Sequence, residues 1–314
     1  MSTRVAQWRS RLAAHLTGWF DTHAAAARVD LGTPRKIDLV RVLSFLAVHL
    51  SVIAVIWVGW SWTAVIVAVV LYLLHMFAIT GFYHRYFSHR AFKTSRALQF
   101  VFALIGNSAA QRGPLWWAAH HRHHHTCADT PDDDHSPTVH GFVWSHVLWF
   151  MTNANFRTRM ERVRDYLTYP ELVFLDRYDA LAPLALIALL YAAGAALGRW
   201  LPQLGTNGPQ LVIWGFSIST VVTYHATFTI NSLDHLWGSR RYATPDTSRN
   251  NLLLALLTLG EGWHNNHHHY PATARQGFFW WEVDVTYYVI RLMALCGLVW
   301  DVRPLPEHAR TVPS

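Results

Sequence analysis

Three short segments of the chain concentrate histidine at spacings that suit metal binding. They read HRYFSH (84–89), HHRHHH (120–125) and HNNHHH (264–269). In the last two segments, three histidines recur at positions i, i+3 and i+4, which places them on one face of a helix. Neutral imidazole binds iron, copper, nickel and zinc. The spacing therefore predicts that each of these helices offers several ligands to a metal site.

The number of histidines exceeds the needs of one structural metal ion. Zinc is usually held by four ligands, whereas the segments supply His84, His89, His121, His124, His125, His264, His267 and His268. We therefore expect two metal ions with open positions. An affinity tag is excluded because the runs are internal and interrupted. We expect the spare His120, His123 and His269 to bind no metal, and we expect His49 and His75, which lie in apolar runs, to be packing residues.

Long runs without charge must position these histidines. No Asp, Glu, Lys or Arg occurs in 42–84, 180–198 or 200–233. A helix needs roughly 20 apolar residues to cross a membrane, so the first run can cross twice if it turns at GWSW (59–62). The other two runs cross once each and are joined by PQLGTNGP (202–209). The sequence predicts an all-α membrane protein of two hairpins, with spans at about 42–60, 62–83, 180–198 and 209–232.

The overall composition agrees with a membrane protein. The 314 residues are 52% hydrophobic and only 14% charged, against about 25% charged in soluble domains. The remaining apolar stretches, 97–111 and 251–260, are too short to span and are expected to be buried or interfacial. Charges interrupt 276–300, which is expected to be an interfacial or packed helix. We divide the chain into an N-terminal segment (1–36), a membrane domain (37–305) and a C-terminal tail (306–314).

The positive charge of the chain predicts its orientation. Of 26 Lys and Arg residues, Arg199 alone lies in a connection on the far side of the predicted spans. Basic residues favour the cytoplasmic side, so both termini and every histidine segment are expected in the cytoplasm, with the chain in the inner membrane. The formal charge of +7 is then explained by topology and anionic lipid. The sequence has no basic stripe with stacking aromatics, so it does not indicate nucleic-acid binding.

Three further features of the sequence limit what the protein can be. Cys127 and Cys296 are the only cysteines, so no disulfide framework is expected. The first 35 residues are polar and lack the apolar core of a cleaved signal peptide. No haem motif, cysteine set for an iron–sulfur cluster or flavin fingerprint is present. Any redox chemistry would therefore take its electrons from an external donor.

The histidine segments resemble the three histidine boxes of membrane-bound fatty acid desaturases, most closely the acyl-CoA Δ9 (stearoyl-CoA type) branch. The matching stretches are HRYFSH, HRHHHTCADTPDDDHSP and GEGWHNNHHHYP. NSLDHLWG (231–238) is similar to a further Asn-x-x-x-His element of that branch, and YATPDTSRNNLLLALLTLGEG (242–262) to the segment before its last box. The likeness covers about residues 37–305 and implies four spans under a cytoplasmic helical cap that holds a di-iron centre.

The resemblance also implies which residues bind the irons. One iron would take His84, His89, His121, His125 and His267. The other would take His124, His235, His264 and His268, together with a water held by Asn231. Neither this division nor the choice of His235 follows from spacing. Asp129, Asp133 and Glu261 are either carboxylates that orient ligand imidazoles or ordinary surface groups.

The chemistry implied is the removal of two vicinal hydrogens from an unactivated acyl chain. Acid–base or nucleophilic catalysis has nothing to act on in such a chain, so an oxidant made from O2 at reduced iron is needed. The two electrons would come from a ferredoxin, a rubredoxin, a cytochrome b5-type protein or a reductase. A related hydroxylase or ketolase is the alternative enzyme. A metal transporter is the non-enzymatic alternative, although it would place polar ligands along the spans.

The acyl carrier is less well defined by the sequence. Animal acyl-CoA desaturases carry an Arg-Asp pair that helps to bind coenzyme A, and the matching positions here are Ala119 and His120. An asparagine of the same surface corresponds to Arg112. We expect an acyl-CoA substrate, with a phospholipid-esterified chain as the alternative. Arg112, Arg177 and Trp263 are the candidate substrate-binding residues.

Overall fold

Helices make up most of the computed structural model, which describes residues 20–27 and 36–310. Within these residues the strands are one short antiparallel pair, β1 (Lys93–Thr94) and β2 (Val299–Trp300), in which Lys93 pairs with Trp300. The predicted helical class is confirmed. Most of the predicted N-terminal segment, and residues 311–314 of the predicted tail, lie outside the described residues.

Four helices of the described chain are long and apolar enough to cross a membrane. They run over Arg41–Val58, Trp62–Ser88, Leu181–Trp200 and Gly208–His235, and they coincide with the predicted spans to within a few residues at most ends. Each is built from one or more labelled elements: α3 (Leu39–Ser51), η1 (Val52–Ala54) and α4 (Val55–Val58); α5 (Trp62–Phe77) and η2 (Ala78–Ser88); α10 (Leu181–Trp200); α11 (Gly208–Leu211), η7 (Val212–Ile218), α12 (Ser219–Ser232) and η8 (Leu233–His235).

The predicted turns coincide with helix breaks that have local causes. Gly59 ends α4 with φ of 65°, a conformation that glycine adopts without strain. Two residues later, the Ser61 hydroxyl accepts a hydrogen bond from the Ala64 N–H and caps α5. After α10, Gly205 has φ of 61° and the Asn207 side chain caps α11. The chain therefore breaks each long apolar run at its turn residues.

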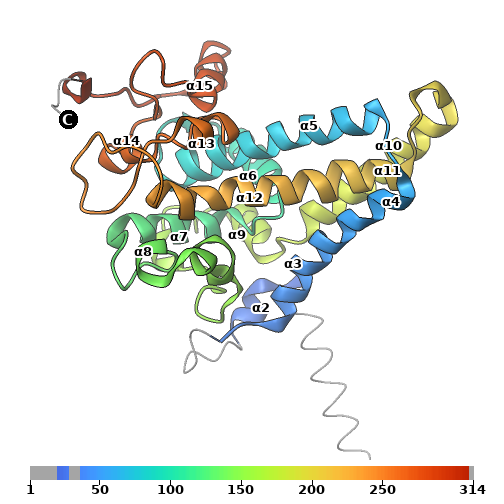
Figure 1. Cartoon of the computed structure of the whole chain (residues 1–314), viewed down its shortest axis with the longest axis horizontal. Coiled ribbons are helices and arrows are strands. Elements are labelled where there is room, and N and C mark those ends of the chain that lie inside the picture. The colour runs from blue at the N-terminus through green and yellow to red at the C-terminus, as the bar shows by residue number, and fades with distance from the viewer. Residues whose placement is uncertain (1–19, 28–35, 311–314) are drawn as a thin grey trace, which may run out of the picture.

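Many of the remaining helices gather at one end of the long helices (Figure 1). Here α7, α8, α13, α14 and α15 lie together, whereas α4 and the connection from α10 to α11 lie at the opposite end. The shorter helical elements are α2 (Thr22–Ala26), α6 (Arg96–Ser108), α7 (Pro114–Cys127), α8 (Pro137–His140), η3 (Trp144–Leu148), η4 (Trp149–Met151), η5 (Met160–Arg162), α9 (Pro170–Arg177), η6 (Pro202–Leu204), α13 (Leu252–Leu257), α14 (His264–His269), α15 (Val285–Leu295) and η9 (Glu307–Arg310).

The main core lies beneath this helical end and fixes the elements that carry histidine. Side chains of η2, α6, α7 and α9 form one buried apolar cluster that includes Phe82, Phe102, Leu115 and Leu172. The rings of Phe82 and Phe102 stack with centroids 3.8 Å apart. Close packing of this kind holds backbones in place, so η2 and α7 meet in a defined register.

Candidate metal centre

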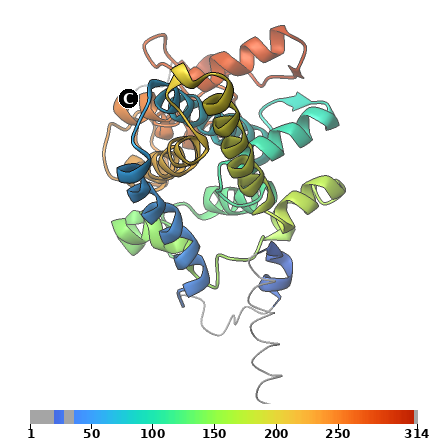
Figure 2. The same ribbon diagram turned by 90° about the vertical axis from the view of Figure 1, so that its right-hand side faces the viewer.

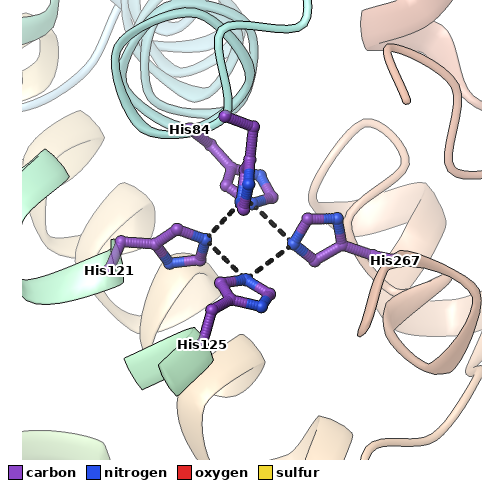
Figure 3. A group of neighbouring side chains, drawn as sticks. His84, His121, His125 and His267 are labelled. Carbon is purple, nitrogen blue, oxygen red and sulfur yellow. Dashed lines mark hydrogen bonds between the residues drawn. The ribbon is translucent and has the colours of Figure 1, made fainter. Parts of the chain in front are cut away.

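Nine histidines from four parts of the chain converge in two groups. The five-histidine group contains His84, His89, His121, His125 and His267, and the four-histidine group contains His124, His235, His264 and His268. Within each group the candidate ligand nitrogens all lie within 4.8 Å of one another. Figure 3 shows His84, His121, His125 and His267 pointing their rings toward a common centre. The grouping equals the division that the family resemblance implies.

The first histidine segment reaches the centre because its helix is wound as a π-helix. His84 and His89 are five residues apart, and in an α-helix this spacing would rotate the second side chain well away from the first. In η2 the backbone hydrogen bonds span five residues, and the His89 N–H donates to the His84 carbonyl over 3.2 Å. The two Nε2 atoms are therefore 3.1 Å apart.

The two other segments each serve both groups. On α7, His121 and His125 join the five-histidine group while His124 joins the four-histidine group. On α14, His267 joins the first group, and His264 joins the second together with His268. The spacing predicted helices with several ligands on one face, and the helices are confirmed. However, each helix lies between two sites and does not supply all its ligands to one site.

Carboxylates face the rear nitrogen of four of these histidines. The Nδ1 atom of His235 lies 2.8 Å from Asp129, that of His124 lies 3.0 Å from Asp133, and that of His84 contacts Glu261. Asp246, which sequence reasoning missed, lies 2.9 Å from Nδ1 of His268. Such carboxylates fix the tautomer and the orientation of a ligand imidazole.

The charges of these pairs suit a cation at the centre. Burial opposes ionisation of Asp129, Asp133 and Asp246, yet the facing imidazoles hold the pKa of each carboxyl below its usual range. An ionised carboxylate accepts the Nδ1–H of its histidine, which leaves Nε2 with a free lone pair. In the described structure Nε2 atoms of neighbouring histidines lie 2.8–3.4 Å apart. Lone pairs that face each other this closely repel unless a cation lies between them.

The donor set therefore fits a first-row metal. Burial, followed by neighbouring imidazoles, holds the pKa of His121, His125 and His267 well below the usual value, so these rings are neutral at pH 7, as a metal ligand must be. Nitrogens at right angles about a metal, each at about 2.1 Å, are about 3.0 Å apart. The Nε2 atoms of His84 and His267 are separated by 3.0 Å, as are those of His125 and His267.

Arg85 supports the first group from behind. Its guanidinium is fully buried and contacts Glu261 over 3.0 Å, Asp284 over 2.9 Å and the Ala274 carbonyl over 2.8 Å. Glu261 in turn contacts His84. Sequence reasoning did not select Arg85, although it is the one charged residue within HRYFSH. Breaking a buried pair of this kind leaves an uncompensated charge, so Arg85 positions Glu261 and, through it, His84.

The spare histidines have other contacts. His120 contacts Asp134, His123 contacts the Asp132 carbonyl, and His269 stacks on Tyr242 with ring centroids 4.3 Å apart. Of the two histidines in apolar runs, His75 contacts Ser108 and His49 contacts His225. None of the five belongs to either histidine group.

A cavity of about 950 Å³ passes the histidines. His84, His121, His124 and His264 line it on one side, and apolar side chains of α3, α5, α10 and α12 line much of the rest. Asn231 also lines it, and its carbonyl accepts a hydrogen bond from Ser145 over 2.8 Å. The arrangement brings an apolar ligand beside two candidate metal positions.

The candidate substrate-binding residues do not lie together. Arg112 lines the cavity and pairs with Asp179 over 2.7 Å. Arg177 is outside the cavity wall and pairs with Asp21 over 2.7 Å. Trp263 precedes α14, is buried, and donates its indole N–H to the Val283 carbonyl. It does not line the cavity either. Of the three, the structure places only Arg112 where it can touch a ligand in the cavity.

Membrane-length helices, two groups of histidine ligands and an apolar cavity beside them define a membrane metalloprotein that acts on an apolar molecule. Comparison with known proteins agrees with this class. A sequence model of the family described as fatty acid desaturase matches residues 60–284. The chain belongs to the fatty acid desaturase family.

Three individual relatives are all named as desaturases. The chain is 37% identical over 279 residues to the sn-1 stearoyl-lipid 9-desaturase of Anabaena variabilis. The aligned region covers 88% of this chain and 97% of the relative. It is 35% identical over 282 residues to Delta-9 acyl-lipid desaturase 1 of Arabidopsis thaliana, covering 88% and 86%. It is 35% identical over 255 residues to Acyl-CoA 5-desaturase AL21 of Anemone leveillei, covering 80% and 75%. The protein is a fatty acyl desaturase, and its histidine groups fit a di-iron site.

Proposed function

We propose that the protein introduces a cis double bond at the Δ9 position of a saturated acyl chain, using O2 and two irons held by the nine histidines. The observation that carries this proposal is the cavity, which runs directly past His84, His121, His124 and His264. Relatives named as 9-desaturases support the bond position. Asn231 lines the cavity at the end of α12, where it would hold a metal-bound water.

The reaction balances only with an external reductant. Two hydrogens leave the chain, two electrons arrive from a donor with two protons, and O2 is reduced to two waters. The bound irons would supply the oxidising power, whereas the protein holds the chain, excludes water and keeps the imidazoles neutral and oriented. A ferredoxin, a rubredoxin, a cytochrome b5-type protein or a reductase would supply the electrons.

Expression in a host that lacks unsaturated fatty acids tests this function. We expect growth without added oleate and a new cis Δ9 monounsaturated chain, detected by mass spectrometry of derivatised lipids. The His267→Ala variant, expressed at the same level, is the matched control and should yield no such chain. A hydroxylated or keto chain in place of the alkene would show a related oxygenase, and a double bond elsewhere would contradict the Δ9 position.

We also propose that the helical end with the histidines faces the cytoplasm and that the chain lies in the inner membrane. The basic residues of the sequence, with Arg199 as the exception, support this orientation. Reporter fusions after Ser61 and Thr206 are expected to read as external, and fusions after Asp133 and Ser314 as cytoplasmic. An external signal after Asp133 would overturn the proposed orientation.

A further inference from the structure

The cavity wall is shared by the first and third membrane-length helices. Ser44, Phe45 and Val48 of α3 line the cavity, as do Leu184 and Ile187 of α10. Val48 follows Ser44 by four positions and Phe45 by three, and Ile187 follows Leu184 by three, so one face of each helix borders the cavity over about one turn. The cavity thus lies between α3 and α10 as well as beside the histidines.

The first membrane-length helix is only partly covered by protein. None of the residues of Arg41–Val58 is buried. α3 packs on α12, where the rings of Phe45 and Tyr224 stack with centroids 6.0 Å apart and His49 contacts His225 over 3.2 Å, whereas Figure 2 shows the end of α3 near α2 lying apart from α10. Its exposed apolar side chains, such as Leu43 and Leu46, must be covered by lipid. Ser44 of α3 and Leu184 of α10 both line the cavity and are exposed, so lipid chains can reach the cavity between these two helices.

The N-terminal helix covers another part of the cavity. Phe20, Thr22 and Ala25 contribute to its wall. This segment is held to α9 because the Thr22 hydroxyl donates to the Asp176 carbonyl over 2.9 Å and the Asp21 carboxylate pairs with Arg177. The part of the cavity next to α9 is thus covered by the segment that contains α2, in contrast to the part between α3 and α10.

The polar groups at the start of α3 are balanced in charge. The Arg41 and Arg112 guanidiniums lie 3.3 and 4.5 Å from the ring centroid of Phe156, and both line the cavity. Arg41 pairs with Asp38 over 3.3 Å, and Arg112 pairs with Asp179 over 2.7 Å. The phosphates of coenzyme A carry several negative charges and favour a surplus of cations. This end of the cavity has no such surplus among its paired side chains.

The positions that correspond to the coenzyme A-binding pair of animal enzymes are also closed off. Ala119 is fully buried within α7. His120 is buried too, and its ring contacts Asp134 and the Arg157 carbonyl. Neither residue lines the cavity. A ligand in the cavity therefore meets no cation at these positions.

We propose that the substrate is an acyl chain still esterified in a membrane glycerolipid, and that it enters the cavity sideways from the bilayer between α3 and α10. The ester and headgroup stay at the level of Arg41, where α3 enters the membrane, and the chain extends to the histidines. This inference rests on the proposed desaturase function and names its carrier. It favours the phospholipid-esterified alternative over the acyl-CoA substrate expected from sequence.

Reconstituted protein tests the carrier. Full-length iron-loaded protein in one set of vesicles receives phosphatidylcholine with carbon-13-labelled stearoyl chains and no acyl-CoA. In a second set, made of dioleoyl phosphatidylcholine, it receives labelled stearoyl-CoA. Both sets contain O2 and the electron donor that supports activity in the expression host, and mass spectrometry follows labelled oleoyl chains in each pool. We expect desaturation of the lipid-esterified chain to be faster by about tenfold or more.

The outcomes separate the two levels of the proposal. Faster product formation from stearoyl-CoA would overturn lateral entry of a glycerolipid and would leave the desaturase function intact. No desaturation of either carrier would count against the proposed function itself. Desaturation of the lipid chain alone would support both.

A pair of variants on α10 tests the path. Ile187→Trp places a large ring in the cavity wall, whereas Leu189→Trp makes a similar change at a side chain that is 67% exposed and does not line the cavity. We expect Ile187→Trp to lower lipid-chain desaturation by about tenfold or more and Leu189→Trp to stay within about twofold. Both variants are checked for an unchanged melting temperature in detergent. Full activity of a normally folded Ile187→Trp variant would exclude this path.

Discussion

Alanine in place of His267 is expected to abolish desaturation. The Nε2 atom of His267 lies 3.0 Å from the Nε2 atoms of both His84 and His125, so this ring joins two other parts of the five-histidine group. Loss of a carboxylate that only orients a ligand costs about 10–100-fold in metal affinity or activity. Loss of the ligand itself is therefore expected to cost more than about 100-fold, measured as the rate of double-bond formation in membranes that contain equal amounts of protein.

Two neighbouring histidines are the matched controls. His269 follows on the same helix and stacks on Tyr242, and His123 precedes His124 on α7 and contacts the Asp132 carbonyl. Alanine at either position is expected to leave more than about half of the activity, because neither residue belongs to a histidine group. Alanine at His124 is expected to behave like alanine at His267. Full activity of the His267→Ala and His124→Ala variants would contradict the assignment.

The long helices could be predicted from sequence because charge and turn residues define them locally. An uncharged apolar segment crosses lipid as a helix of roughly 20 residues, because only a helix satisfies its own backbone hydrogen bonds there. Gly59 and Ser61 mark the point at which the longest uncharged run breaks into two helices. The i, i+3, i+4 histidines of α7 and α14 were equally local, since helix geometry alone brings them to one face. These elements agree between sequence and structure for that reason.

The partners across the site could not be predicted from spacing. His84 and His89 meet only because η2 is a π-helix, and the five-residue spacing is otherwise unremarkable in sequence. Asp246 lies in a segment without regular structure, 22 residues before the histidine that it contacts. Arg85 connects η2 with Glu261 and Asp284, far along the chain. Each of these contacts depends on the tertiary fold, and no local pattern marks it.

Substrate contacts were the weakest part of the sequence-based account, for a related reason. Arg177 is basic and near the start of α10, yet its charge is used to hold Asp21 of the N-terminal segment. Arg41, which no motif selects, lines the cavity and stacks on Phe156. A basic residue in sequence can face a ligand, a neighbouring carboxylate or lipid, and only the packed structure distinguishes these.

Two irons per chain are the second large effect that we expect. The five-histidine and four-histidine groups are separate sets of converging nitrogens, and together they exceed what one four-coordinate zinc ion needs. His84 belongs to one set and His264 to the other. Alanine at His84 is therefore expected to lower the iron content by about one ion, or by both if the two ions bind cooperatively, and His269→Ala is expected to leave it unchanged.

Metal analysis of the purified full-length protein tests whether the nine histidines bind two irons. Protein expressed in iron-sufficient medium is freed of loosely bound metal by gel filtration, and iron, zinc, copper and nickel are measured by mass spectrometry against protein from amino-acid analysis. We predict about two irons per chain, one for each histidine group, with little of the other metals. Zinc in place of iron, or a single metal ion per chain in fully active protein, would contradict this prediction.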